Sequence, residues 1–120
     1  MLFVYNADGT VFGLLSDAAH KALSPRTYQC DLCRLTYGLV RQKPQWRSFV
    51  SSLPVPAAFL HRDEFRHRYP GCASAPLPAI FVQSDGGSLE LLISAAELSA
   101  VQKLDELEAL VADRVAAIAA

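Results

Sequence analysis

A chain of 120 residues has the length of one domain and can bury a single hydrophobic core. Its 52% hydrophobic and 19% charged residues are typical of a globular protein and exclude an intrinsically disordered one. The net charge of −1 disfavours a nucleic-acid partner, because proteins that bind nucleic acids usually carry a basic face or stripe.

The first predicted elements are a buried strand and two helices. Residues 2–5 form a short apolar run of β-formers that ends at a turn, which predicts a buried strand. Apolar residues recur at intervals of three and four over residues 11–23, which predicts a helix that packs on the sheet. A second, short helix is predicted to carry Cys30 and Cys33 and to stop at Gly38.

The middle of the chain predicts a helix, a second strand and a charged connection. Pro44 fits the first position of a helix whose apolar side includes Trp46. Residues 57–60 predict a strand, and because it is joined to the first strand through helices, we expect the two strands to be parallel. Residues 61–69 read as a polar helical turn or loop anchored by aromatic side chains.

The last third predicts a hairpin and a long helix. Residues 78–82 and 89–93 are strand-like runs on either side of Asp85-Gly86, which is a typical hairpin turn. A capping box that begins at Ser94 or Ser99 is predicted to start the last helix, whose apolar stripe should cover one face of the sheet.

This order of elements resembles the thioredoxin fold, most specifically around the segment Leu77-Pro78-Ala79-Ile80-Phe81-Val82. Thioredoxins have a cis proline just before the corresponding strand, so we predict a cis bond between Leu77 and Pro78. The resemblance implies a single thioredoxin-like α/β domain over residues 1–120, with a four-stranded mixed sheet flanked by helices. Residues 24–43 would then be a helical insertion that carries the CxxC motif and has little apolar surface of its own.

The chain departs from thioredoxins in the position of its cysteines. Thioredoxins place their two cysteines directly after the first strand, whereas this chain has Asn6-Ala7-Asp8-Gly9-Thr10 there. Thioredoxin disulfide chemistry is therefore not transferred to Cys30 and Cys33 by position. The run Tyr5-Asn6-Ala7-Asp8, followed by Asp17, His20 and Cys30-Asp31-Leu32-Cys33, also resembles a family of small, mostly uncharacterised bacterial proteins, which implies no particular activity.

Four potential metal ligands fall within 17 residues of sequence. Asp17 and His20 are three residues apart in the predicted helix, so they share one face, and Cys30 and Cys33 have the same spacing. Two thiolates, one imidazole and one carboxylate suit a tetrahedral zinc site. We therefore predict that a zinc-like divalent transition metal is bound by Asp17, His20, Cys30 and Cys33.

Two other interpretations use the same residues. A thiol–disulfide oxidoreductase would use Cys30 as the nucleophile and Cys33 as the resolving thiol. Asp17 and Asp31 oppose this role, because negative charges nearby disfavour a thiolate, whereas a metal would compensate them. The third interpretation is a protein-interaction adaptor with no chemistry, in which the cysteines are small core residues.

The remaining polar groups and the ends of the chain give weaker indications. His61, Asp63, Glu64 and His67 form a possible second metal or acid/base cluster, but a solvated charged turn is the favoured interpretation. No stretch approaches the ~18 apolar residues of a membrane span, and the first residues lack a signal-peptide pattern. We therefore expect a cytoplasmic protein whose cysteines are reduced or metal-bound. Cys72 has no obvious partner. The sequence specifies neither a protein partner nor an oligomeric state.

Overall fold

A four-stranded mixed sheet organises the described part of the chain, which comprises residues 1–6, 31–36 and 42–119 of the computed structural model. The strands run in the order β2-β1-β3-β4 across the sheet. As predicted, β1 and β2 are parallel, and β3 and β4 form an antiparallel hairpin in which β3 also pairs with β1. The strands are β1 (Leu2–Val4), β2 (Ala58–Leu60), β3 (Ala79–Gln83) and β4 (Leu89–Ile93).

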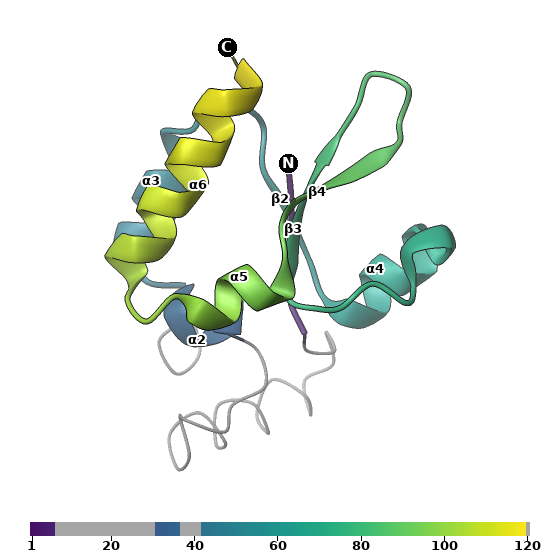
Figure 1. The fold of residues 1–120 in the computed structure, drawn as a ribbon, viewed down its shortest axis with the longest axis horizontal. Coiled ribbons are helices and arrows are strands. Elements are labelled where there is room, and N and C mark those ends of the chain that lie inside the picture. The colour runs from purple at the N-terminus through teal and green to yellow at the C-terminus, as the bar shows by residue number, and fades with distance from the viewer. Residues whose placement is uncertain (7–30, 37–41, 120) are drawn as a thin grey trace.

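Helices cover both faces of the sheet (Figure 1), so the prediction of an α/β fold is confirmed. On one face, α3 and α6 form a layer, with α2 and α5 beside them, and α4 lies on the opposite face. The predicted helix over residues 11–23 lies outside the described residues. The helices are α2 (Asp31–Thr36), α3 (Pro44–Ser51), α4 (Arg62–Arg68), α5 (Ala95–Ala100) and α6 (Leu104–Ala119), with a 3₁₀ turn at Pro70–Cys72.

The central strand β1 supplies both hydrophobic cores, because successive strand side chains point to opposite faces. Phe3 belongs to the larger core, where its ring meets the edge of the Trp46 ring at a centroid distance of 5.5 Å. Leu2 and Val4 belong to the smaller core, together with Phe65 of α4. The apolar run at the start of the chain is therefore buried on both sides, as predicted.

Helix α2 belongs to the larger core. Leu32 and Leu35 are both buried in the cluster that also contains Trp46. Thr36 is fully buried, and its hydroxyl donates to the carbonyl of Leu32 at 2.7 Å. The prediction that residues 24–43 have little apolar surface of their own is wrong for residues 31–36, because this helix buries its leucines against the rest of the domain.

The chain after β4 forms two helices, which the sequence did not indicate. Ser94 caps α5 through a capping box with Glu97, as its spacing predicts, but this helix ends at Ala100. Val101 is extended and buried, so it continues the apolar surface outside any helix. The prediction that a capping box starts the last helix is wrong, because α6 begins only at Leu104, after this break.

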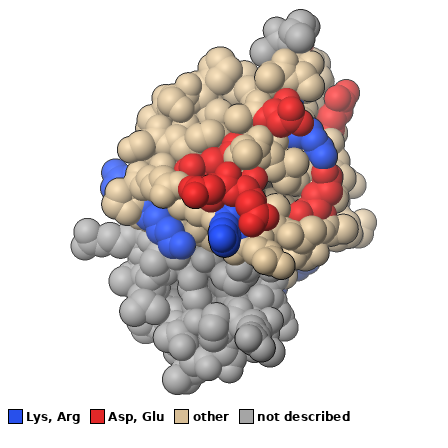
Figure 2. All heavy atoms as spheres, turned by 60° about the vertical axis from the view of Figure 1, so that its left-hand side comes forward, with Lys and Arg blue, Asp and Glu red and all other residues tan. Residues whose placement is uncertain are grey.

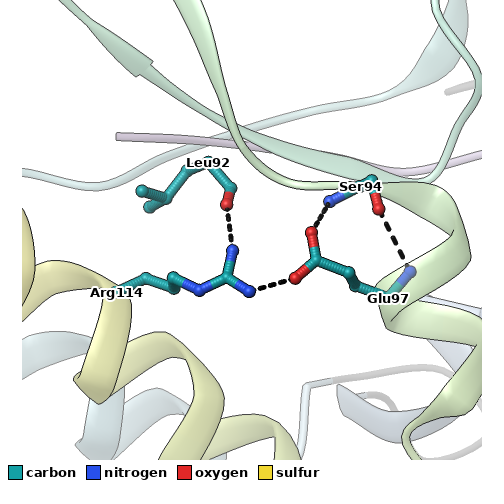
Figure 3. Close-up of polar contacts among 4 residues, drawn as sticks. All are labelled: Leu92, Ser94, Glu97 and Arg114. Carbon is teal, nitrogen blue, oxygen red and sulfur yellow. Dashed lines mark hydrogen bonds and ion pairs between the residues drawn. The ribbon is translucent and has the colours of Figure 1, made fainter.

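A β-bulge in β4 is bound by an arginine from α6. Ile80 pairs with Ile93 and Phe81 with Leu91, so Leu92 is the extra residue of the bulge. Arg114 donates from Nη1 to the carbonyl oxygen of Leu92 at 2.7 Å, and its Nη2 forms an ion pair with Glu97 (Figure 3). One guanidinium thereby connects β4, α5 and α6.

Two backbone predictions near β3 are confirmed. The peptide bond between Leu77 and Pro78 is cis. At the hairpin turn, Gly87 donates its N–H to the carbonyl of Ser84 at 2.9 Å. Gly87 has a φ of 87°, a conformation that glycine adopts without the steric cost that a Cβ atom brings.

Candidate functional site at the carboxyl edge of the parallel strands

The parallel strands β1 and β2 end at one edge of the sheet, which we call the carboxyl edge and define by Tyr5, Asn6 and His61. These residues follow the last residues of the two strands, Val4 and Leu60, which pair with each other. Open α/β sheets bind ligands outside the carboxyl ends of their strands, so this edge is the natural place for a site. Helix α4 begins here, and α2 lies on the same side of the molecule (Figure 1).

Tyr5 connects the end of β1 to the chain that follows α2. Its side chain is only 2% exposed, and its hydroxyl accepts a hydrogen bond of 3.0 Å from Nε2 of Gln42. The same core cluster contains Tyr5 and Leu32, so the end of β1 and α2 share one packed interior. Tyr5 and α2, which flank residues 7–30 in the sequence, therefore pack in the same part of the domain.

His61 is held by Glu64, three residues further along the chain. One carboxylate oxygen, Oε1 of Glu64, lies 2.6 Å from Nδ1 of His61 and also accepts the backbone N–H of His61 at 3.0 Å. The backbone and side-chain hydrogen bonds from His61 hold the pKa of Glu64 below its usual range. Glu64 is therefore a carboxylate at neutral pH, which makes Nδ1 of His61 the donor in this pair.

Further contacts join β1 to the start of α4 beside this pair. The rings of Tyr5 and His61 lie 5.9 Å apart between centroids at an angle of 44°. Arg62 donates from Nη1 to Oδ1 of Asn6 at 3.3 Å. The carboxyl edge thus holds a phenol, an imidazole, a guanidinium and a carboxylate on two neighbouring strands and one helix.

The predicted metal ligands are largely outside the described residues. Asp17, His20 and Cys30 lie there, while Cys33 is the third residue of α2, whose backbone is described. Within residues 1–6, 31–36 and 42–119, no three His, Cys, Asp or Glu side chains form a metal-binding group. The predicted set of four ligands therefore stays a prediction.

The second predicted cluster is brought together only in part. The structure joins His61 to Glu64, whereas Asp63 and His67 are exposed on α4, as the solvated-turn interpretation expects. Sequence reasoning missed the contribution of Gln42, which no local pattern indicates, because its partner Tyr5 lies 37 residues away. The burial of Tyr5 could be predicted in part, because strand alternation places Tyr5 on the same face as Phe3.

The surface that α6 covers is acidic. Figure 2 shows Asp and Glu side chains gathered on this side of the molecule, where Asp105, Glu106 and Asp113 are exposed. Gln45 of α3 binds two acidic groups of α6, with its Nε2 2.8 Å from Asp105 and 2.9 Å from Glu108. Lys and Arg side chains lie scattered among the acidic groups (Figure 2) and do not form the basic face or stripe that usually binds nucleic acids. Within the described ranges, no helix combines the length and the apolar character needed to cross a bilayer.

Comparison with known proteins finds no match among protein-family models, curated proteins or solved structures. Neither the resemblance to thioredoxins nor the resemblance to small bacterial proteins gains support from these comparisons. We therefore infer the function from the residues of this chain alone.

Proposed function

We propose that this chain is a thioredoxin-like domain that binds one zinc-like divalent transition metal through Asp17, His20, Cys30 and Cys33. The observation that carries the proposal is the donor set: two thiols and an imidazole with a carboxylate, in two pairs of equal spacing. Zinc prefers four such ligands in a tetrahedron, and its charge would offset the negative charge of the thiolates and of Asp17. A cytoplasmic location is part of the proposal, since the thiols must stay reduced to bind metal.

The position of Cys33 in the fold supports this function. Cys33 belongs to α2, which packs on the rest of the domain through the buried Leu32 and Leu35, so the backbone of one proposed ligand lies in a helix of the core. The sheet order β2-β1-β3-β4, with one parallel pair and an antiparallel hairpin, supports the thioredoxin-like architecture. A metal held between α2 and the preceding segment would stabilise the folded chain as well as serve chemistry.

The competing function is thiol–disulfide exchange by Cys30 and Cys33. In the sequence, Cys30 lies near the predicted start of a short helix, and a helix N-terminus favours the thiolate of a cysteine placed there. In that case Cys30 would attack a disulfide as a thiolate and Cys33 would resolve the mixed disulfide. Both functions use the same two sulfur atoms, so the state of those atoms distinguishes them.

Thiol counting in a Cys72→Ala variant provides the test, because the chain has three cysteines and this change leaves only Cys30 and Cys33. The protein is purified without added metal, and its metal content and thiols reactive to Ellman's reagent are measured. Metal binding predicts one equivalent of metal, with both thiols masked until a chelator is added. A disulfide predicts thiols that a reductant restores and a chelator does not. Two reactive thiols without metal, which an added disulfide oxidant does not convert into a Cys30–Cys33 disulfide, would contradict both functions and favour a protein-interaction adaptor.

Ligand variants test the remaining two members of the set. His20→Ala should remove the metal as completely as Cys33→Ala, because each deletes one of four ligands. A dithiol would survive the loss of His20 with its disulfide chemistry intact. His67→Ala is the matched control, since it removes an exposed imidazole from α4 and should leave the metal content unchanged.

A further inference from the structure

His61 has a fixed position at the carboxyl edge that the proposed metal site does not use. It follows the last residue of β2 and occupies the N-cap position of α4. Glu64 Oε1 accepts both the backbone N–H and, at 2.6 Å, the Nδ1–H of this residue. A distance of 2.6 Å is short for a bond between nitrogen and oxygen, which is typical of a charge-assisted bond. Because a carboxylate only accepts hydrogen bonds, this contact favours the tautomer with the proton on Nδ1 and holds the plane of the imidazole.

The imidazole of His61 also lies near a buried aromatic ring. The ring centroids of Tyr5 and His61 are 5.9 Å apart, and Tyr5 is itself held by burial and by Gln42. Even so, 31% of the His61 side chain is exposed, so a small molecule can approach it. With Nδ1 occupied by Glu64, the nitrogen left to act on such a molecule is Nε2.

We propose that His61 is a proton acceptor that acts through Nε2 on a small neutral acid bound at the carboxyl edge. The substrate class is a molecule with an activated C–H, an O–H or an S–H group. In the step, the bond from the substrate to its proton breaks, the electron pair stays on the substrate, and the proton binds to Nε2. Nδ1–H remains donated to Glu64, whose negative charge stabilises the imidazolium that forms. The step needs no oxidant, reductant or further reactant.

The competing role for this pair is helix capping alone. An N-cap side chain normally accepts a hydrogen bond from a backbone N–H of the first helical turn, and His61 and Glu64 have the arrangement of such a capping box. If His61 served only in this way, Nδ1 would be the acceptor and the proton would be on Nε2. The two roles therefore require opposite tautomers of the same ring.

Long-range ¹H–¹⁵N NMR spectra of the full chain show which ring nitrogen carries the proton. A pH of 8 is chosen because it lies above the ordinary histidine pKa of ~6.5. The proposal predicts that His61 carries its proton on Nδ1, and that Glu64→Ala abolishes this preference. His67, whose exposed side chain has no hydrogen-bond partner among the described residues, is the reference for a solvated ring. A proton on Nε2 of His61 in the unsubstituted chain would overturn the proposal.

Base strength toward a substrate is tested with 5-nitrobenzisoxazole. A base removes its C3 proton while the ring N–O bond breaks and a C≡N bond forms, which releases a coloured phenolate. His61→Gln should lower the second-order rate constant about tenfold or more, because positioned bases contribute ~10²–10⁴-fold and this probe is not shaped for the site. Glu64→Gln should give an intermediate rate, and His67→Gln should stay within about twofold of the parent chain. Equal rates for His61→Gln and the parent, in chains with unchanged circular dichroism, would refute the role of His61.

Discussion

Arg114 should contribute a measurable part of the stability of the fold, because one guanidinium joins three elements. Its Nη1 binds the carbonyl of Leu92 in the β4 bulge at 2.7 Å, and its Nη2 pairs with Glu97 of α5. We expect Arg114→Met, which keeps the aliphatic part of the side chain, to remove both interactions. The bulge carbonyl would then lose a charged donor and α5 would lose its link to α6 (Figure 3).

The expected loss follows from the geometry. A hydrogen bond from a charged group contributes about 1.5–3 kcal/mol. The ion pair adds about 0.2–1 kcal/mol at most, because the side chains of Arg114 and Glu97 are 35% and 36% exposed. Solvent screening at this exposure favours the lower values, so the expected decrease in the free energy of unfolding is about 2 kcal/mol. Arg114→Lys should lose about half as much, since one ammonium group cannot reproduce the two-armed contact.

Urea denaturation measures this loss. With a slope of about 1–3 kcal/mol per molar urea, a decrease of 2 kcal/mol moves the midpoint by about 1 M. Arg66→Met is the control, because Arg66 is an exposed arginine of α4 with no polar partner within the described ranges, and its loss should cost under about 0.5 kcal/mol. An Arg114→Met protein as stable as the Arg66→Met protein would refute the reasoning.

Three further predictions concern acid stability, the smaller core and the hairpin turn. Hydrogen bonds from the Arg114 guanidinium and from the backbone N–H of Ser94 hold the pKa of Glu97 below its usual range. The stability that Glu97 contributes is therefore complete above the ordinary glutamate pKa of ~4.3, and it is lost as the pH falls through the lowered pKa of the folded state. Glu97→Gln should therefore lose less unfolding free energy than the parent chain between about pH 6 and about pH 3, measured by urea denaturation at each pH. Phe65→Ala should lower the free energy of unfolding by about 3–5 kcal/mol, because the ring is fully buried, and a loss under about 1 kcal/mol would contradict that burial. Gly87→Ala should cost about 1 kcal/mol at its positive φ, whereas Gly86→Ala, with open space around its Cβ position, should stay within about 0.5 kcal/mol of the parent in thermal denaturation.

Local patterns predicted the sheet well. The run of residues 2–5 was short, apolar and β-forming, and the structure buries it on both faces as β1. Residues 78–82 and 89–93 flank a turn with the glycine that a hairpin requires, so the β3-β4 pairing was also accessible. These features depend on neighbours in the sequence, which is why periodicity and turn chemistry were sufficient.

Packing between distant residues was not accessible from the sequence. The break at Val101 between α5 and α6 depends on that side chain being buried among helices, which no local signal indicates. The side chain of Gln42 bonds to Tyr5, which is 37 residues away in the sequence, and Arg114 bonds to Glu97, which is 17 residues away. Such contacts form only once the layers of the fold are in place, so propensity and spacing do not specify them.

The candidate site was also predictable from the sequence only in part. His61 and Glu64 have the spacing of neighbours on one helical face, and their contact is local. The sequence nevertheless favoured a solvated turn, because a charged stretch is usually exposed. The bond to Glu64 and the position beside the Tyr5 ring together distinguish His61 from the exposed His67 of α4.

X-ray absorption at the metal edge tests the proposed zinc site, because it counts the atoms bound to the ion. On protein purified with zinc, we expect two sulfur atoms at about 2.3 Å and two nitrogen or oxygen atoms at about 2.0–2.2 Å. The same measurement on Cys33→Ala should show the loss of a sulfur ligand or of the metal itself. A spectrum of the parent protein with no sulfur ligands would contradict binding by Asp17, His20, Cys30 and Cys33.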